Sequence, residues 1–227
     1  MNFQYSFLKM NNKLIINKIK PVADAASVPA AFAAAEVPYH TLDALNWPDS
    51  YPYKPDVRFA AAHTSDAILL HYKVSEQAVL AHCSSDRESI WQDSCVEFFL
   101  SPEPGDGLYY NFEFNCIGRM YACVGPDRNK RNFLPDSAFC AVQRYATLGG
   151  DPFEERKGGY DWELSVVIPV RCLTAHDIKK LDGRRMKGNF YKCGDHLSVP
   201  HFVSYAPINV PKPDFHRPDC FCKLVFE

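Results

Sequence analysis

The sequence lacks any long apolar run. No segment reaches the ~20 uninterrupted apolar residues that a membrane-spanning helix needs, so we expect no membrane span. The chain also lacks an excess of one charge: 25 basic and 27 acidic residues leave a formal net charge of -2, which gives no electrostatic reason to expect nucleic acid or an anionic membrane as a partner. Internal repeats and low-complexity segments are missing as well. With 47% hydrophobic residues among 227, the composition excludes a disordered or collagen-like chain.

A clear secretion signal is also missing. Residues 1–20 place lysines after a mildly apolar run that has no convincing apolar centre. The nine cysteines are an odd number, so at least one is unpaired, and a chain of 25.8 kDa can fold without disulfide bonds. Free-thiol usage favours a cytoplasmic location without establishing it, because buried cysteines occur in every compartment. The oligomeric state is left open.

Hydrophobic residues alternate with a period near two along most of the chain. This pattern, in short runs separated by Pro, Gly, Asp and Ser, predicts an all-β fold: a two-sheet antiparallel β-sandwich of jelly-roll type with a few short helices. Helices are expected only at 30–36 and 171–180. The predicted strands are 67–74, 78–83, 94–100, 108–116, 119–124, 139–147, 160–168, 189–193, 201–205 and 221–226.

The simplest organisation is a single domain over residues 1–227 with an N-terminal arm at 1–40. The proline-rich stretches 48–55 and 207–218 carry aromatic residues, which a flexible tether would not need, so we interpret both as ordered loops.

The most informative segment is a predicted hairpin between Trp91 and Cys116. If Leu100 and Leu108 close its turn, paired residues have numbers that sum to about 208, and the alternation separates two faces. The apolar face contains Val96, Phe98, Tyr110, Phe112 and Phe114. The other face, expected to be a solvated polar platform, contains Cys95, Glu97, Phe99, Tyr109, Asn111, Glu113 and Asn115.

The side chains of this platform have the chemistry of sugar recognition. Carboxylates and carboxamides can bridge vicinal hydroxyl groups with two hydrogen bonds, and an aromatic ring such as Trp91 at the rim can cover the C–H face of a pyranose. The alternative is an ordinary outer sheet face, paired by cross-strand hydrogen bonds.

Three stretches of the chain match the pattern of a known family. They are Trp91-x-Asp93-Ser94-x-Val96-Glu97-Phe98-Phe99, Tyr110-x-Phe112-x-Phe114-Asn115-x-x-Gly118, and Trp162-Glu163 leading into Ile168-Pro169. With these motifs the sequence resembles the family 9 carbohydrate-binding modules and their bacterial relatives, from about Trp47 to strand 221–226. The resemblance implies a β-sandwich that binds sugar chain ends, such as those of xylan or cellulose, between aromatic rings. It also implies that structural calcium and an attached xylanase are common.

Carried over to this sequence, the resemblance assigns roles to single residues. Trp91 resembles one wall of the aromatic slot, Glu97 resembles the carboxylate that holds sugar hydroxyls, and Asn115 and Asn189 resemble the amide contacts. Two departures stand out. Glu113 lies where a characterised module can present an arginine, and the second aromatic wall is assigned to Tyr205.

The C-terminal third supplies further candidates. Asn189 and Tyr191 share one strand face, His201 and Tyr205 share another, and loop 207–218 carries Phe215 and His216. Four prolines reduce the freedom that this loop must lose on ordering, which suits a preformed site wall, although a simple crossover would look the same.

Other candidates come from the earlier part of the chain. Arg58 and His63 could contact a ligand, although a lone arginine is commonly a surface charge and a lone histidine commonly structural. Trp47 and Trp162 are interpreted as packing residues.

A hydrolase is the minority interpretation. Glu97 and Glu113 share the platform face as diagonal neighbours, so their carboxyl groups could approach the ~5 Å separation of a retaining glycosidase. Hydrolysis also requires one carboxyl group to be held protonated, which a sequence does not report.

Metal and haem sites are not assigned. Cys-x-x-Cys is absent, and the scattered zinc-type donors are Cys193, His196, His201, His216, Cys220 and Cys222. Calcium-type donors in glycine-containing loops are Asp106, Asp127 and Asp182, without the spacing of a dedicated calcium loop. The four methionines show no patterned histidine partner for haem.

The sequence thus predicts a non-catalytic sandwich that binds a mono- or oligosaccharide. The ligand-binding candidates are Arg58, Trp91, Glu97, Tyr109, Asn111, Glu113, Asn115, Asn189, Tyr191, His201 and Tyr205. The rival is an intracellular scaffold that has kept the fold and lost the sugar.

Overall fold

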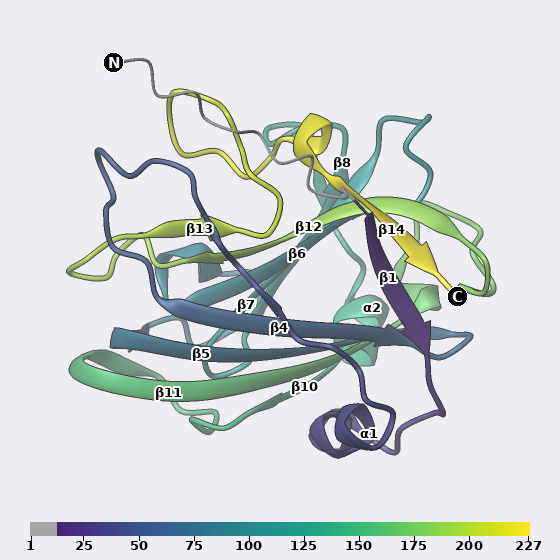
Figure 1. Cartoon of the computed structure of the whole chain (residues 1–227), viewed down its shortest axis with the longest axis horizontal. Coiled ribbons are helices and arrows are strands. Elements are labelled where there is room, and N and C mark those ends of the chain that lie inside the picture. The colour runs from purple at the N-terminus through teal and green to yellow at the C-terminus, as the bar shows by residue number, and fades with distance from the viewer. Residues whose placement is uncertain (1–12) are drawn as a thin grey trace, which may run out of the picture.

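A computed structural model describes residues 13–227, and this part of the chain is a β-sandwich (Figure 1). The strands are β1 (Lys13–Lys18), β2 (His40–Thr41), β3 (Ala44–Leu45), β4 (Asp56–His63), β5 (Ala67–Ala81), β6 (Cys95–Ser101), β7 (Tyr109–Asn115), β8 (Met120–Gly125), β9 (Asn132–Phe133), β10 (Gln143–Ala146), β11 (Phe153–Pro169), β12 (Arg185–Cys193), β13 (Phe202–Ser204) and β14 (Cys222–Phe226). The helices are α1 (Val28–Ala34), α2 (Asp136–Ala141) and 3-10 turns at Ala25–Ser27, Ile90–Gln92, Val170–Cys172 and Pro218–Cys220.

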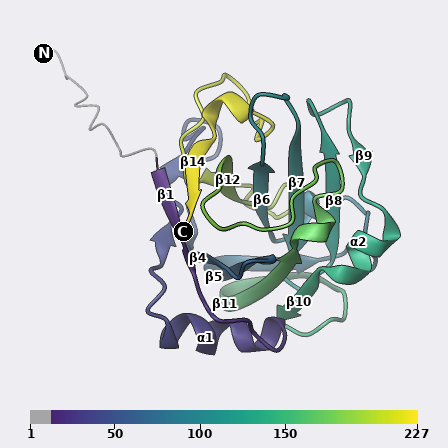
Figure 2. The ribbon, with the colours of Figure 1, turned by 90° about the vertical axis from the view of Figure 1, so that its right-hand side faces the viewer.

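The strands form two layers that are joined along one edge. One layer has the order β10-β11-β5-β4 and the other has the order β14-β12-β6-β7-β8-β9. β1 links them, because it pairs in parallel with both β4 and β14. Figure 2 shows β12, β6, β7 and β8 in one layer above β4, β5 and β11. The sandwich prediction is confirmed, with the correction that the sheet is mixed rather than purely antiparallel.

A single apolar core fills the space between the layers. The predicted apolar face of the hairpin lies here, as the burial of Phe98, Phe112 and Phe114 shows. Phe59 on β4 stacks on Phe190 on β12 with ring centroids 3.9 Å apart, which joins the two layers directly. The alternation on β6 and β7 therefore sends their other faces away from this core.

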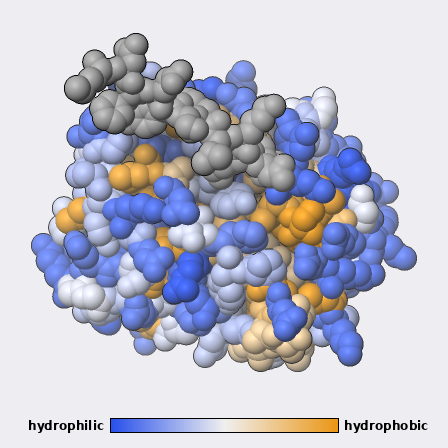
Figure 3. All heavy atoms as spheres, viewed as in Figure 1, coloured by the Kyte–Doolittle hydropathy of each residue, from blue (hydrophilic) through white to orange (hydrophobic). Residues whose placement is uncertain are grey.

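The outer face of the β4–β5–β11 layer is covered by α1. Val28 and Phe32 of this helix are buried against Ala62 and Leu69 of the sheet. Figure 3 shows apolar residues gathered over α1 and over the β1–β14 pair on this side of the molecule, with hydrophilic residues over much of the rest. No helix within residues 13–227 combines the length and apolar character that a bilayer crossing requires.

Several element predictions need correction. The predicted strands 67–74 and 78–83 are one continuous strand, β5, because the polar Glu76 between them is accommodated in the interior. β4 was not among the predicted strands: only its first four residues alternate between exposed and buried, and residues 60–63 are buried on both faces. The segment 139–147 begins in α2 and only then forms β10.

The predicted helix 171–180 is reduced to the 3-10 turn Val170–Cys172. Beyond it, the backbone amides of Ala175 and Leu181 donate to Tyr110 Oη and to the Ser65 carbonyl, so other segments satisfy them. Much of the predicted arm 1–40 is also ordered: β1 lies inside the sheet and α1 packs on it, while residues 1–12 lie outside the described part.

Candidate functional site

The β6–β7 hairpin has the predicted faces but a different register. Leu100 pairs with Tyr110 rather than with Leu108, since Ser101 Oγ and Asp106 Oδ1 bond Leu108 inside a longer loop. The shift moves pairing by two residues, so the same side chains still share a face. Glu97 and Glu113 consequently lie directly opposite each other instead of diagonally.

The expectation that this face is solvated is wrong. Glu97 and Glu113 are only 3% and 2% exposed, because residues from the proline-rich loops pack over the face. The resulting second apolar cluster is made of Trp47, Cys83, Ile90, Cys95, Phe99, Tyr109, Tyr191, Cys193, Ile208, Phe215 and Phe221. The cover is incomplete, since a cavity of about 470 Å³ remains above the two carboxyl groups.

The cavity combines acidic, aromatic and basic side chains. Its residues are Tyr51, Trp91, Glu97, Glu113, Arg128, Asn129, Arg131, Cys193, Asp195, Phe202, Lys212, Pro213, Asp214, Phe215 and His216. The strands contribute Glu97, Glu113, Cys193 and Phe202, the 3-10 turn Ile90–Gln92 contributes Trp91, and loops contribute the rest of the wall. Seven of the fifteen lining residues are charged and four are Tyr, Trp or Phe, so the cavity offers many polar contacts together with a few aromatic faces.

The two glutamates have perturbed titration because they are buried together. Burial raises the pKa of Glu97 well above its usual value, and the charge of Glu113 adds to the effect. Burial also raises the pKa of Glu113 to about 7, with Arg131 opposing the shift. Burial likewise raises the pKa of Asp195 to about 6.

Each glutamate keeps free hydrogen-bonding capacity. Cys193 Sγ donates to Glu97 Oε1 over 3.1 Å, and Asn111 Nδ2 donates to Glu113 Oε1 over 2.9 Å. Within residues 13–227, Glu113 Oε2 has no hydrogen-bond partner although it is buried. A buried carboxylate oxygen of this kind favours a donor such as a hydroxyl group.

Two aromatic pairs, Trp91 with Tyr121 and Phe215 with Tyr191, lie at the cavity, and one member of each pair lines it. Trp91 meets Tyr121 edge to face, with centroids 5.3 Å apart, and the Arg131 guanidinium lies 5.4 Å from the same Tyr121 ring. Phe215 stacks on Tyr191 at 4.3 Å, and Tyr191 Oη donates to the Phe215 carbonyl over 3.2 Å. The stacked pair fixes the proline-rich loop against β12.

His216, which follows Phe215 in the same loop, is held neutral. Arg131 Nη1 donates to His216 Nε2 over 2.6 Å, so the proton of the neutral ring resides on Nδ1, which lies 2.8 Å from Tyr109 Oη. Burial lowers the pKa of His216 to about 2, and the charges of Arg131 and Arg128 contribute. His216 therefore positions Arg131 at the cavity without adding a charge.

The predicted ligand residues fall into three groups. Trp91, Glu97 and Glu113 line the cavity. Tyr109, Asn111 and Tyr191 lie behind its lining and support it. The remaining predicted residues, which do not line the cavity, are Arg58, Asn115, Asn189, His201 and Tyr205.

The two amides carried over from the family pattern are engaged with the protein itself. Asn115 Nδ2 donates to Asp93 Oδ2, and its Oδ1 accepts from the Arg119 amide. Asn189 Nδ2 donates to the Ala206 carbonyl, and its Oδ1 accepts from the Phe190 and Ala206 amides. Both amides are fully buried.

Tyr205, His201 and Arg58 lie elsewhere. Tyr205 packs edge to face on Phe59 at 5.2 Å, on the core side of the sheet, so the aromatic rings facing the cavity opposite Trp91 come from other residues. Arg58 is exposed on β4 in the other layer, where it lines a separate hollow with Lys73. His63 bonds the carbonyls of Thr64 and Glu227 and is structural.

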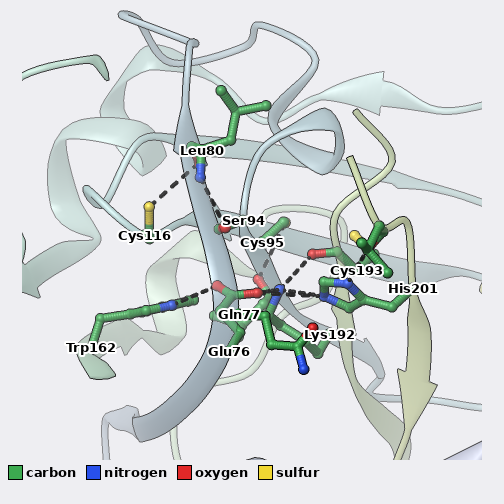
Figure 4. Close-up of polar contacts among 12 residues, drawn as sticks. Glu76, Gln77, Leu80, Ser94, Cys95, Cys116, Trp162, Lys192, Cys193 and His201 are labelled. Carbon is green, nitrogen blue, oxygen red and sulfur yellow. Dashed lines mark hydrogen bonds and ion pairs between the residues drawn. The ribbon is translucent and has the colours of Figure 1, made fainter. Parts of the chain in front are cut away.

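His201 belongs to a polar cluster inside the protein (Figure 4). Lys192 Nζ pairs with Glu76 Oε2 at 2.8 Å and donates to His201 Nε2 at 2.7 Å. Trp162 Nε1 donates to Glu76 Oε1 over 2.7 Å. The cluster satisfies its charges internally, which explains why Glu76 does not interrupt β5.

Several cavity residues were not predicted. They are Tyr51, Arg128, Asn129, Arg131, Asp195, Phe202, Lys212 and Asp214. The clearest available signal was the pair of arginines in the segment after Gly125, which is rich in Pro, Asp and Asn. Their approach to Glu113 depends on tertiary folding and has no local sequence signature.

The metal-type donors noted in the sequence, for which no site was assigned, are mostly far apart in the structure. Among residues 13–227, the group of three donors with convergent ligand atoms is Cys95, Glu97 and Cys193. Of the scattered zinc-type donors only Cys193 belongs to it. The calcium-type carboxylates are apart: Asp106 bonds His176, Asp127 bonds the Asn129 amide and Asp182 pairs with Lys18.

The sandwich and its aromatic, acidic cavity define a class of small-ligand-binding β-domains. The pattern of Carbohydrate-binding family 9 matches residues 26–226, and the chain belongs to this family. A solved candidate carbohydrate-binding protein from Bacteroides uniformis ATCC 8492 is 46% identical, with a TM-score of 0.92 over 95% of this chain and 99% of that one.

More distant structures share the fold alone. A family 9 module from Caldicellulosiruptor kristjanssonii in complex with cellotriose is 11% identical, with a TM-score of 0.59 over 95% of this chain and 93% of that one. A family 9 module from the same organism in complex with glucose is 13% identical, with a TM-score of 0.56 and 95% of each chain covered. No curated protein matches the sequence.

Proposed function

We propose that this chain binds a mono- or oligosaccharide non-covalently in the cavity above Glu97 and Glu113. The observation that carries the proposal is a pair of buried, opposed carboxyl groups beneath aromatic rings, with Glu113 Oε2 lacking a protein partner in the described part of the chain. Vicinal hydroxyls suit two adjacent carboxyl groups, and the C–H face of a pyranose suits an aromatic ring.

The size and opening of the cavity support a small ligand. Its volume of about 470 Å³ lies within the range of small-molecule sites. Trp91 is half-buried, and Phe215 is 8% exposed and held by Tyr191, so both rings are fixed before a sugar arrives. Preformed walls lower the entropic cost of binding, and we expect dissociation constants of micromolar to millimolar order.

The ligands of the related modules direct the choice of sugar. Family 9 modules bind cellotriose and glucose in their complexes. The first candidate ligands are therefore glucose-based chain ends, and the next are other plant cell-wall glycans such as xylan. Arg128, Arg131 and Lys212 also line the cavity and could donate to sugar oxygens.

A non-catalytic role fits the geometry better than hydrolysis. A glycosidase places its two carboxyl groups on either side of the scissile bond. Glu97 and Glu113 instead lie side by side on neighbouring strands beneath one surface of the cavity. Both can hold the same face of a sugar, but neither reaches its opposite side.

Calorimetry against a panel of cello- and xylo-oligosaccharides tests the proposal. The wild-type chain should release heat with at least one member, and Trp91→Ala should abolish that heat. Tyr145→Ala is the matched control, because Tyr145 is 47% exposed and lies outside the cavity lining. Equal affinities for wild type and Trp91→Ala would remove Trp91 from the site. No heat from the wild type with any sugar would favour a scaffold that has lost sugar binding.

A further inference from the structure

Two thiols and a carboxyl group converge at the base of the cavity. Cys193 on β12 is the register partner of Cys95 on β6, and Glu97 lies two residues further along β6 on the same face. One ligand atom from each of the three side chains lies within 4.8 Å of the others. We propose that Cys95, Cys193 and Glu97 form a binding site for a single soft divalent cation of the zinc or cadmium class.

The spacing of the donors fits tetrahedral coordination. With metal–sulfur bonds of about 2.3 Å and metal–oxygen bonds of about 2.1 Å, neighbouring donors of a tetrahedral site are about 3.6–3.8 Å apart. All three donor atoms lie within 4.8 Å of one another, and Cys193 Sγ and Glu97 Oε1, now 3.1 Å apart, would have to separate by about 0.5 Å. Small rotations of the side chains would therefore complete three corners of the tetrahedron.

The donor chemistry selects the ion. Thiolate sulfur prefers zinc, cadmium or copper(I), whereas calcium and magnesium require oxygen ligands. The site is therefore distinct from the calcium expected in this family. The charge of the cavity as a whole does not select a cation, because Arg128, Arg131 and Lys212 offset its carboxyl groups, so the selection rests on the two thiols.

The cavity gives the ion access and a fourth ligand. Glu97 and Cys193 both line it, while Cys95 is fully buried beneath. Three protein ligands around a cation leave one position for a water molecule. Binding releases the two thiol protons, and any proton carried by the buried Glu97 carboxyl group, to solvent. The ion then replaces the hydrogen bonds that Cys193 Sγ makes to Glu97 Oε1 and to the Trp91 carbonyl.

Metal and sugar should compete for the cavity, and this step rests on the proposed function. Glu97 cannot offer the same oxygen to an ion and to a sugar hydroxyl. Metal binding itself is measured without any sugar, and sugar binding is measured with a chelator present, so failure of one proposal leaves the other standing.

Titration of the reduced protein with Cd²⁺ alone tests the site. We expect one ion per chain, seen as thiolate-to-cadmium charge-transfer absorption, and affinity at least ~100-fold weaker in Cys95→Ser and in Cys193→Ser. Cys140→Ser is the control, because Cys140 is exposed and lies outside the cluster. Undiminished absorption in both cluster variants would overturn the proposal.

A second measurement uses the unaltered chain, in case a serine variant fails to fold. Co²⁺ added to the wild type should give the intense visible bands of a tetrahedral site together with thiolate-to-cobalt charge transfer. Weak octahedral bands without charge transfer would overturn the site. Loss of two titratable thiols before metal addition would show that the pair forms a disulfide instead, and this too would contradict the proposal.

Discussion

Glu97 on β6 and Glu113 on β7 are direct cross-strand partners, and each is at least 97% buried. Like charges placed opposite each other on neighbouring strands destabilise a sheet. The structure tolerates the pair because Cys193 and Asn111 donate hydrogen bonds to it and Arg131 lies nearby. The arrangement retains two buried carboxyl groups at the base of a cavity, at a cost in stability.

Replacing Glu113 by glutamine should therefore stabilise the protein at alkaline pH. The pKa of Glu113 is raised to about 7 in the fold, so the folded state holds a proton more tightly than the unfolded state, and stability falls as pH rises from about 4.5 to 7. Above that window Glu113→Gln should unfold with a free energy about 1–3 kcal/mol higher than the wild type, and near pH 4 the difference should shrink.

Urea denaturation of both proteins at pH 8.5 and near pH 4, with a chelator present, measures this effect. Glu154→Gln is the control, because the Glu154 side chain is 88% exposed and its loss should change little. A Glu113→Gln variant less stable than the wild type at pH 8.5 would show that Glu113 is compensated by its neighbours.

Tyr121 should influence sugar binding although it does not line the cavity. Its ring meets Trp91 edge to face at 5.3 Å and lies 5.4 Å from the Arg131 guanidinium, so it orients two cavity residues at once. Aromatic pairs of this kind contribute about 0.5–1.5 kcal/mol. Tyr121→Leu should weaken sugar binding about 2- to 10-fold, whereas Tyr121→Phe, which keeps the ring, should bind like the wild type. Calorimetry distinguishes these outcomes. If Tyr121→Leu binds the sugar as tightly as the wild type, Tyr121 is not needed to orient Trp91.

The sequence was informative where a signal is local. Alternation placed Val96 and Phe98 in the core and Glu97 on the opposite face, and it predicted the sandwich. It left open whether loop 207–218 forms a site wall or a simple crossover, because the path of this loop over β6 depends on contacts such as the stack of Phe215 on Tyr191, 24 residues apart. The position of Tyr205, predicted as the second aromatic wall, has the same origin: it directly follows β13, and its contact with Phe59 is defined only in the folded chain.

The interior cluster of Glu76, Lys192 and His201 should also make the stability of the fold depend on pH (Figure 4). His201 Nε2 accepts from Lys192 Nζ at 2.7 Å and Nδ1 donates to the Val199 carbonyl at 3.1 Å, so the ring is neutral. Glu76 Oε2 lies 3.5 Å from Nε2, and the Tyr53 ring lies 5.3 Å away. Burial, with the Lys192 charge, lowers the pKa of His201 to about 2.

This histidine should make the fold sensitive to mild acid. The unfolded chain protonates it near pH 6.5 and the folded chain only near pH 2, so the unfolded state binds more protons between these values and stability falls as pH decreases through them. The slope from His201 is at most about 1.4 kcal/mol per pH unit. His201→Gln keeps an acceptor for Lys192 but cannot titrate, so its free energy of unfolding should vary less with pH between about 6 and 4. His82→Gln is the control and should retain the wild-type slope, because the His82 side chain is 74% exposed.

If His201→Gln does not fold, the ring protons of His201 can be followed by NMR in the wild type. They should show a neutral ring at pH 5, and a midpoint near 6.5 would contradict a buried, neutral His201.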